Sequence, residues 1–141
     1  MLTQLKRDDT LDTDSVMEAR FAILESALHR LETVCDPDAI RRAAIRLSAI
    51  LHDHYELEQD PQSFFSEVQE IATHRQMDIL RLRQEHGPIL DGLNSLGQAA
   101  GVAATSLRLR ALKLIGRIRE HEALEAQAYF DGLYNDLGGM G

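Results

Sequence analysis

The sequence predicts an all-α protein, an antiparallel up-down-up-down four-helix bundle. Apolar residues recur every three to four positions in four segments, as on helices with one buried face. Alternation with period two, which is typical of half-buried strands, occurs nowhere. The 141 residues include only 3 prolines, no tryptophan and 5% aromatic residues, a composition that favours helices over a β-sandwich. Amphipathic helices joined by short connections pack as antiparallel neighbours.

The first two helices are predicted from their capping residues. The first is expected to begin at Asp14 or Ser15, both good N-caps, and to continue to about residue 34. Asp36 is then the N-cap of a second helix, with Pro37 in its first turn, where a missing N–H costs nothing. This helix should end near Gln59, before the Asp60-Pro61 break. Residues 62–72 resemble a short amphipathic turn or two.

The last two helices surround a stretch of small residues. The third is predicted to run from about residue 73 to residue 96 and to kink at Gly87-Pro88, because proline removes a backbone hydrogen bond. Residues 97–104 form the linker. The fourth helix is expected to begin with Thr105 or Ser106 as its cap and to end at Asn135-Asp136. The predicted organisation is an N-terminal arm over residues 1–13, a bundle over 14–136 and a flexible tail over 137–141.

Composition narrows the class of protein and its partners. The net charge of −8 disfavours binding to nucleic acid or to an anionic membrane. The single cysteine, Cys35, cannot form an intramolecular disulfide, and the apolar runs are too short for a signal peptide or a membrane span. We therefore expect a cytoplasmic protein with no nucleic-acid or membrane partner, and the sequence does not identify a protein partner.

Ionisable residues occupy the inward stripes of three predicted helices. His54 and Glu58 continue the apolar stripe of the second helix, His86 lies within that of the third, and His121 and Glu125 continue that of the fourth. Each His-x3-Glu pair projects from one helix face, and in an antiparallel bundle all five residues can meet at one height. Buried imidazoles and carboxylates are costly unless they are paired or bind metal.

This ligand set predicts a metal centre. Imidazole nitrogens with carboxylate oxygens suit iron, manganese or zinc, and two carboxylates with histidines outside them suggest two ions. Alternatively, a single such histidine is an ordinary core histidine, and a single His-x3-Glu pair is a common helix hydrogen bond. Two pairs plus a third inward histidine at one height favour the metal.

Three segments resemble the hemerythrin-like, or HHE cation-binding, family: ILHDHYELEQDPQSFF (50–65), RLRQEHGPILDGL (81–93) and IREHEALEAQAYFDGL (118–133). The resemblance implies a hemerythrin-like bundle with a non-haem di-iron centre, in which Glu58 and Glu125 bridge the irons and His54, His86 and His121 are terminal ligands. It further implies binding or sensing of dioxygen, nitric oxide or peroxide, or iron handling. The alternatives are a metal-poor interaction or regulatory module and a di-iron oxidase-like enzyme.

The sequence departs from the family pattern at two places. One turn on either side of His86 the residues are leucines, so the third helix offers one imidazole. On the first helix, His29 is predicted to face solvent and to lie too close to the turn. The part of the first helix at the height of the predicted centre is residues 17–21, where Glu18 is the one possible ligand. Met17 and Phe21 are expected to line a gap there, in which a diatomic ligand would bind.

Other polar residues near the predicted centre carry weaker signals. Tyr129, one turn after Glu125, is a possible hydrogen-bond partner of a ligand, with a packed core tyrosine as the alternative. His52 and Glu56 fall on the outer flank of the second helix and are expected to be solvated.

Overall fold

A computed structural model describes residues 2–60 and 76–138, and within these ranges all regular structure is helical. The elements are α1 (Leu2–Thr33), α2 (Pro37–Gln59), α4 (Gln76–Arg83), α5 (His86–Gly97) and α6 (Ala104–Gly138). The predicted all-α class is therefore confirmed. No helix in the described part of the chain is both long and apolar enough to span a membrane.

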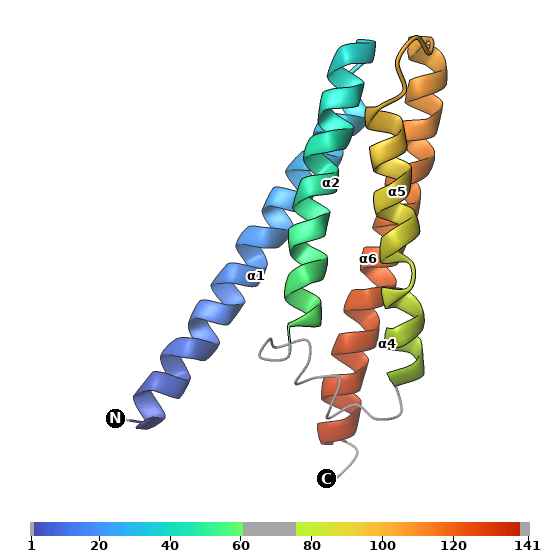
Figure 1. The fold of residues 1–141 in the computed structure, drawn as a ribbon. Coiled ribbons are helices and arrows are strands. Elements are labelled where there is room, and N and C mark those ends of the chain that lie inside the picture. The colour runs from blue at the N-terminus through green and yellow to red at the C-terminus, as the bar shows by residue number, and fades with distance from the viewer. Residues whose placement is uncertain (1, 61–75, 139–141) are drawn as a thin grey trace.

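The helices pack side by side into a bundle (Figure 1). α2 contacts α1, α5 and α6, while α6 also contacts α1, α4 and α5. The exception is the N-terminal part of α1, which diverges from the other helices toward the lower left of Figure 1. As a result, α1 packs on the bundle mainly through its C-terminal half, where Leu24, Ala27, Leu28 and Leu31 are buried.

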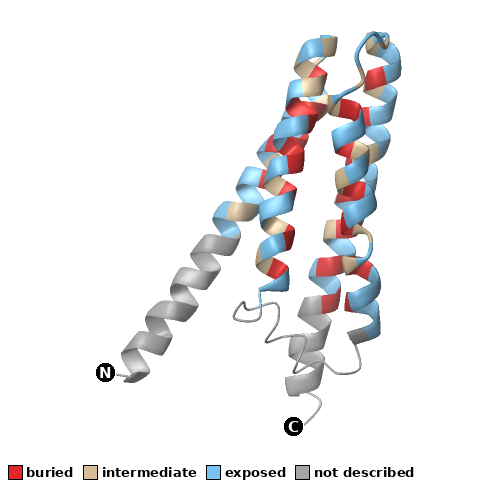
Figure 2. Cartoon of the chain, in the orientation of Figure 1, coloured by how far each residue is buried: buried red, intermediate tan, exposed pale blue. Residues whose placement is uncertain are grey.

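The core follows the predicted apolar stripes (Figure 2). The core residues come from α1, α2, α5 and α6 and are almost completely buried. The largest of them are Leu28, Leu31, Ile40, Leu47, Leu51, Ile89, Leu93, Leu96, Leu107 and Ile118. Burying a side chain of this size contributes about 1.5–3 kcal/mol. Apolar burial therefore holds together the end of the bundle that contains the α1–α2 and α5–α6 connections.

The start of α2 is built as its sequence predicts. Asp36 accepts a hydrogen bond from the Ala39 backbone N–H at 3.1 Å, and Pro37 stands in the first turn. Such a cap contributes about 1 kcal/mol. The helix ends at Gln59, before Asp60 takes an extended conformation.

The predicted start of the first helix is wrong. α1 begins at Leu2, so the helix already includes residues 2–13. Residues 1–33 contain neither glycine nor proline, so a good capping residue such as Asp14 cannot by itself stop a helix that nothing else interrupts. The fourth helix likewise begins before its predicted caps, at Ala104, and continues to Gly138. The predictions for residues 62–72 and 139–141 fall outside the described residues.

The third predicted helix is interrupted beside His86, as the Gly87-Pro88 pair indicates. α4 ends at Arg83 and α5 begins at His86. Pro88 has no N–H to donate to the Gln84 carbonyl four residues earlier, so the helical ladder cannot continue there. The Glu85 N–H instead donates to the Leu82 carbonyl at 3.0 Å, which tightens the turn.

Candidate metal centre

The five ionisable residues singled out by the sequence lie together in the structure. They come from the last turns of α2, the first residue of α5 and the middle of α6. Glu58 is 0% exposed, while His86, His121 and Glu125 are all buried. The His54 side chain is 17% exposed, so it forms the edge of the cluster. Each residue continues a core stripe, because α2 buries Leu51, Tyr55 and Glu58, and α6 buries Ile118, His121 and Glu125.

Glu125 lies between the histidines of the other two helices. Its Oε2 is 3.1 Å from His86 Nε2 and 3.2 Å from His121 Nε2. Its Oε1 is 3.9 Å from His54 Nε2. Two groups of potential metal ligands share this residue, namely His86–His121–Glu125 and His54–Glu122–Glu125, and within each group the ligand atoms lie within 4.8 Å of one another.

Glu58, on α2, likewise lies between His54 and His86. Its Oε1 is 2.9 Å from His54 Nε2, and its Oε2 is 3.4 Å from His86 Nε2. Glu58 belongs to neither ligand group. Both contacts lie within ion-pair distance, and within the described part of the chain neither oxygen has a hydrogen-bond partner. A buried carboxylate in this condition is costly, and a cation among these side chains would compensate for that cost.

The cluster therefore has two ends, joined by two carboxylates. We call His86 and His121 the imidazole pole, and His54 and Glu122 the carboxylate pole. Glu58 and Glu125 each direct one oxygen to either pole. The two carboxylates thus stand between the poles.

Neighbouring side chains fix the orientation of the histidines. His121 Nδ1 pairs with Glu85 Oε2 at 2.8 Å, so its Nε2 faces the cluster. A carboxylate on the far nitrogen of a ligating histidine is the usual support of such a ligand. The Tyr55 ring stacks on His86 with centroids 3.5 Å apart and planes 2° from parallel. Arg83 donates to the Glu58 carbonyl at 2.8 Å and holds α4 against the end of α2.

Burial and pairing shift the acid–base properties of the cluster. Burial raises the pKa of Glu58, as does the neighbouring Glu125 carboxylate, and despite the opposing effect of His54 this pKa reaches about 9. Burial alone would raise the pKa of Glu125, but hydrogen bonds to His121 and His86 hold it below its ordinary value.

The two paired histidines shift in the direction that their carboxylates dictate. Burial would lower the pKa of His54, but its contacts with Glu122 and Glu58 raise that pKa to about 10. Burial opposes the charged form of His121 as well, yet Glu125 and Glu85 raise its pKa. With a carboxylate at each ring nitrogen, His121 donates to both only as an imidazolium. Protons thus supply the positive charge of the cluster when no metal ion does.

Sequence reasoning missed three participants. Glu122 lies one turn before Glu125 on the same helix face, a spacing that could have identified it. Tyr55 is four residues after Leu51 and hence on the buried stripe of α2. Glu85 had no such signal, because only the break beside Pro88 brings it to His121.

The described side chains of the first helix, from residue 18 onward, do not meet the expectation of a ligand or a lined gap. Glu18 is exposed and belongs to neither ligand group. Phe21 is 61% exposed, so the prediction that it lines a gap beside the centre is wrong. The physical reason is that α1 diverges from the bundle toward its N-terminus (Figure 1). The side chains of Met17 and Tyr129 fall outside the described residues.

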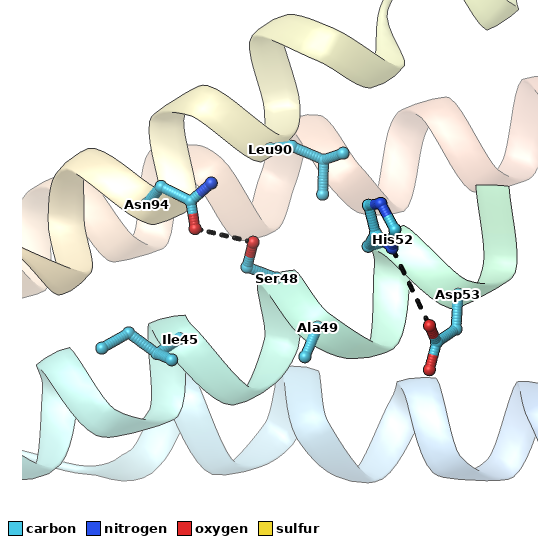
Figure 3. Close-up of a pocket in the computed structure, with 7 residues that line it drawn as sticks. All are labelled: Ile45, Ser48, Ala49, His52, Asp53, Leu90 and Asn94. Atoms are coloured by element: carbon cyan, nitrogen blue, oxygen red, sulfur yellow. Dashed lines mark hydrogen bonds and ion pairs between the residues drawn. The ribbon is translucent and has the colours of Figure 1, made fainter. Parts of the chain in front are cut away.

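The remaining histidines of the described helices lie at the surface, as predicted. His29 is exposed, and the His52 and Glu56 side chains are 60% and 70% exposed. His52 and Asp53 instead line a hollow of about 360 Å³ between α2 and α5 (Figure 3). In that hollow Ser48 donates to the Asn94 side-chain oxygen at 2.9 Å. None of the five cluster residues lines it, so it is a separate feature.

Comparison of the chain with protein-family models, curated proteins and solved structures finds no match. The assignment of a function therefore rests on the site. A buried group of histidines and glutamates with converging, unsatisfied oxygens fits a metal ion.

Proposed function

We propose that this chain is a hemerythrin-like protein: an antiparallel up-down-up-down four-helix bundle that holds a dinuclear non-haem iron centre. Glu58 and Glu125 bridge the two ions, and His54, His86 and His121 are terminal ligands. The observation that carries the proposal is that each carboxylate faces His54 with one oxygen and His86 with the other.

The protein residues hold and orient the centre. Glu85 fixes the ring orientation of His121, and the stack of Tyr55 on His86 does the same at α5. The apolar residues of the surrounding stripes exclude water from the imidazole pole, where His86 and His121 are buried. Access is expected at the carboxylate pole, because the His54 and Glu122 side chains are each 17% exposed.

The proposed activity is the binding or sensing of dioxygen, nitric oxide or peroxide, or the handling of iron itself. A pair of irons supplies redox chemistry that small oxidants and diatomic molecules engage. The other ligand side chains are buried, which favours molecules of a few atoms over large substrates, and we therefore place binding or sensing ahead of an oxidase-like enzyme. Zinc or manganese also suits the ligand types.

Metal analysis tests the proposal. The wild-type protein, purified without chelators, is expected to contain two iron ions per chain and to change its absorption spectrum on exposure to dioxygen or nitric oxide. Glu58→Ala and Glu125→Ala should each lose more iron than His86→Ala, because a bridging carboxylate serves two ions and a terminal imidazole serves one. His52→Ala, which changes an exposed histidine of the same helix as His54, is the matched control.

Two results would contradict the proposal. Wild-type protein that binds no metal even when loaded would favour the alternative of a metal-poor interaction or regulatory module. Near-wild-type iron in both carboxylate variants would remove the bridging assignment.

A further inference from the structure

The two poles of the cluster differ in their ligand chemistry. The imidazole pole offers two ring nitrogens from side chains that are 5% and 0% exposed, His86 and His121. The carboxylate pole offers one ring nitrogen and the Glu122 carboxylate, and both of its side chains are 17% exposed. Glu58 and Glu125 each place one oxygen beside either pole. The carboxylate pole thus carries one more negative charge and one nitrogen fewer.

Glu122 has the position of a ligand. Its Oε2 is 3.4 Å from His54 Nε2, beyond a good hydrogen bond between these atoms but within the reach of a shared ion. Its Oε1 is buried and has no hydrogen-bond partner among the described residues. The Glu58 oxygen beside His54 also has no hydrogen-bond partner among the described residues, and the Glu58 side chain is completely buried. Two carboxylates that each carry an unsatisfied buried oxygen beside one imidazole indicate a site for a cation.

We propose that Glu122 is a metal ligand and that the two poles prefer unlike ions: the imidazole pole a borderline ion such as Zn²⁺ or Fe²⁺, the carboxylate pole a harder ion such as Mn²⁺. This inference rests on the dinuclear centre proposed above. Imidazole suits zinc and iron, while carboxylate and water oxygens suit manganese, so the difference in ligand sets translates into a difference in preference. A single equivalent of Zn²⁺, added first, occupies the pole that binds it best. Mn²⁺ added afterwards should not displace it, because Zn²⁺ binds more tightly than Mn²⁺ at most sites.

The test loads the metal-free, full-length protein with one equivalent of Zn²⁺ and then with Mn²⁺. One Zn²⁺ and one Mn²⁺ per chain are expected by native mass spectrometry. Pulsed electron paramagnetic resonance of the bound Mn²⁺ should detect one directly coordinated histidine nitrogen, since His54 is the one histidine of the carboxylate pole. Two coupled histidine nitrogens would place Mn²⁺ at the imidazole pole and overturn the assignment of preferences.

Matched variants separate the poles. Glu122→Gln is nearly isosteric and is expected to weaken Mn²⁺ binding by at least about tenfold, with the Zn²⁺ affinity unchanged. Glu85→Gln, which weakens the support of His121, should instead lower the Zn²⁺ affinity by about tenfold or more and leave Mn²⁺ binding unchanged. Unchanged Mn²⁺ affinity in Glu122→Gln, with two ions still bound, would overturn the role of Glu122 and leave the dinuclear centre standing. Failure of the wild-type protein to bind a second ion of any kind would overturn the proposed function with it.

Discussion

If the cluster binds metal, uptake should release protons, because several of its side chains hold a proton in the metal-free state. In the metal-free state His54 and Glu58 have pKa values of about 10 and about 9, so both hold a proton at pH 7. The pKa of His121 is also raised, and its two carboxylate partners require the imidazolium form. All three groups must lose a proton to bind a metal ion through these atoms. Full loading at pH 7 is therefore expected to release more than one proton per chain.

The same groups at their ordinary pKa values would give a different result. Two histidines with a pKa of about 6.5 and an ionised glutamate would together release only about half a proton at pH 7. The release should also decline as the pH approaches 10, because Glu58 and then His54 deprotonate before metal is added.

A pH-indicator titration in weak buffer measures this release directly. Calorimetry in buffers of different ionisation enthalpy provides an independent count. Glu58→Gln removes one titrating group and should release about one proton fewer per chain than wild-type protein loaded to the same metal content. A release below one proton per loaded wild-type chain would refute the charge states assigned to the cluster.

Three further predictions follow from the same contacts. The folded-state pKa values of His54 and Glu58 lie above their unfolded values, so their stabilising contribution is complete below the unfolded pKa and is lost as the pH rises through about 9 to 10. The free energy of unfolding of the metal-free protein, measured with urea, should therefore fall from pH 6.5 to 8.5, by up to about 1.4 kcal/mol per pH unit for each extra proton bound; a rise would contradict the shifts. Metal-loaded protein should melt above metal-free protein, because an ion that binds the folded chain more tightly than the unfolded chain stabilises it, and equal melting temperatures at saturating metal would reject this linkage. His29→Ala should leave the metal content unchanged and alter stability by no more than about 0.5 kcal/mol, as at an ordinary exposed site, whereas loss of one ion per chain would make His29 a ligand.

Local signals predicted those parts of the fold that local chemistry determines. The start of α2 depends on Asp36 and Pro37, which act within one turn, and its structure matches the prediction. The break beside His86 depends on Pro88, whose missing N–H acts on its own helix. The start of α1 could not be located in this way, because Asp14 is an adequate cap in a segment that contains no helix breaker.

The site was predictable to the extent that it continues the apolar stripes. His54, Glu58, His86, His121 and Glu125 could be identified because a polar residue at a core position is costly without a partner. Their partners depend on how the helices pack. Glu85 reaches His121 only across the break between α4 and α5, and the divergence of α1, which leaves Phe21 exposed, has no counterpart in the periodicity.

The most direct test of the dinuclear centre is anomalous X-ray diffraction from crystals of the iron-loaded protein at the iron edge. Two peaks per chain are expected, one among His86 Nε2, His121 Nε2 and Glu125 Oε2, and one among His54 Nε2, Glu122 and Glu125 Oε1. A single peak, or iron bound only at exposed carboxylates outside the cluster, would contradict the dinuclear centre.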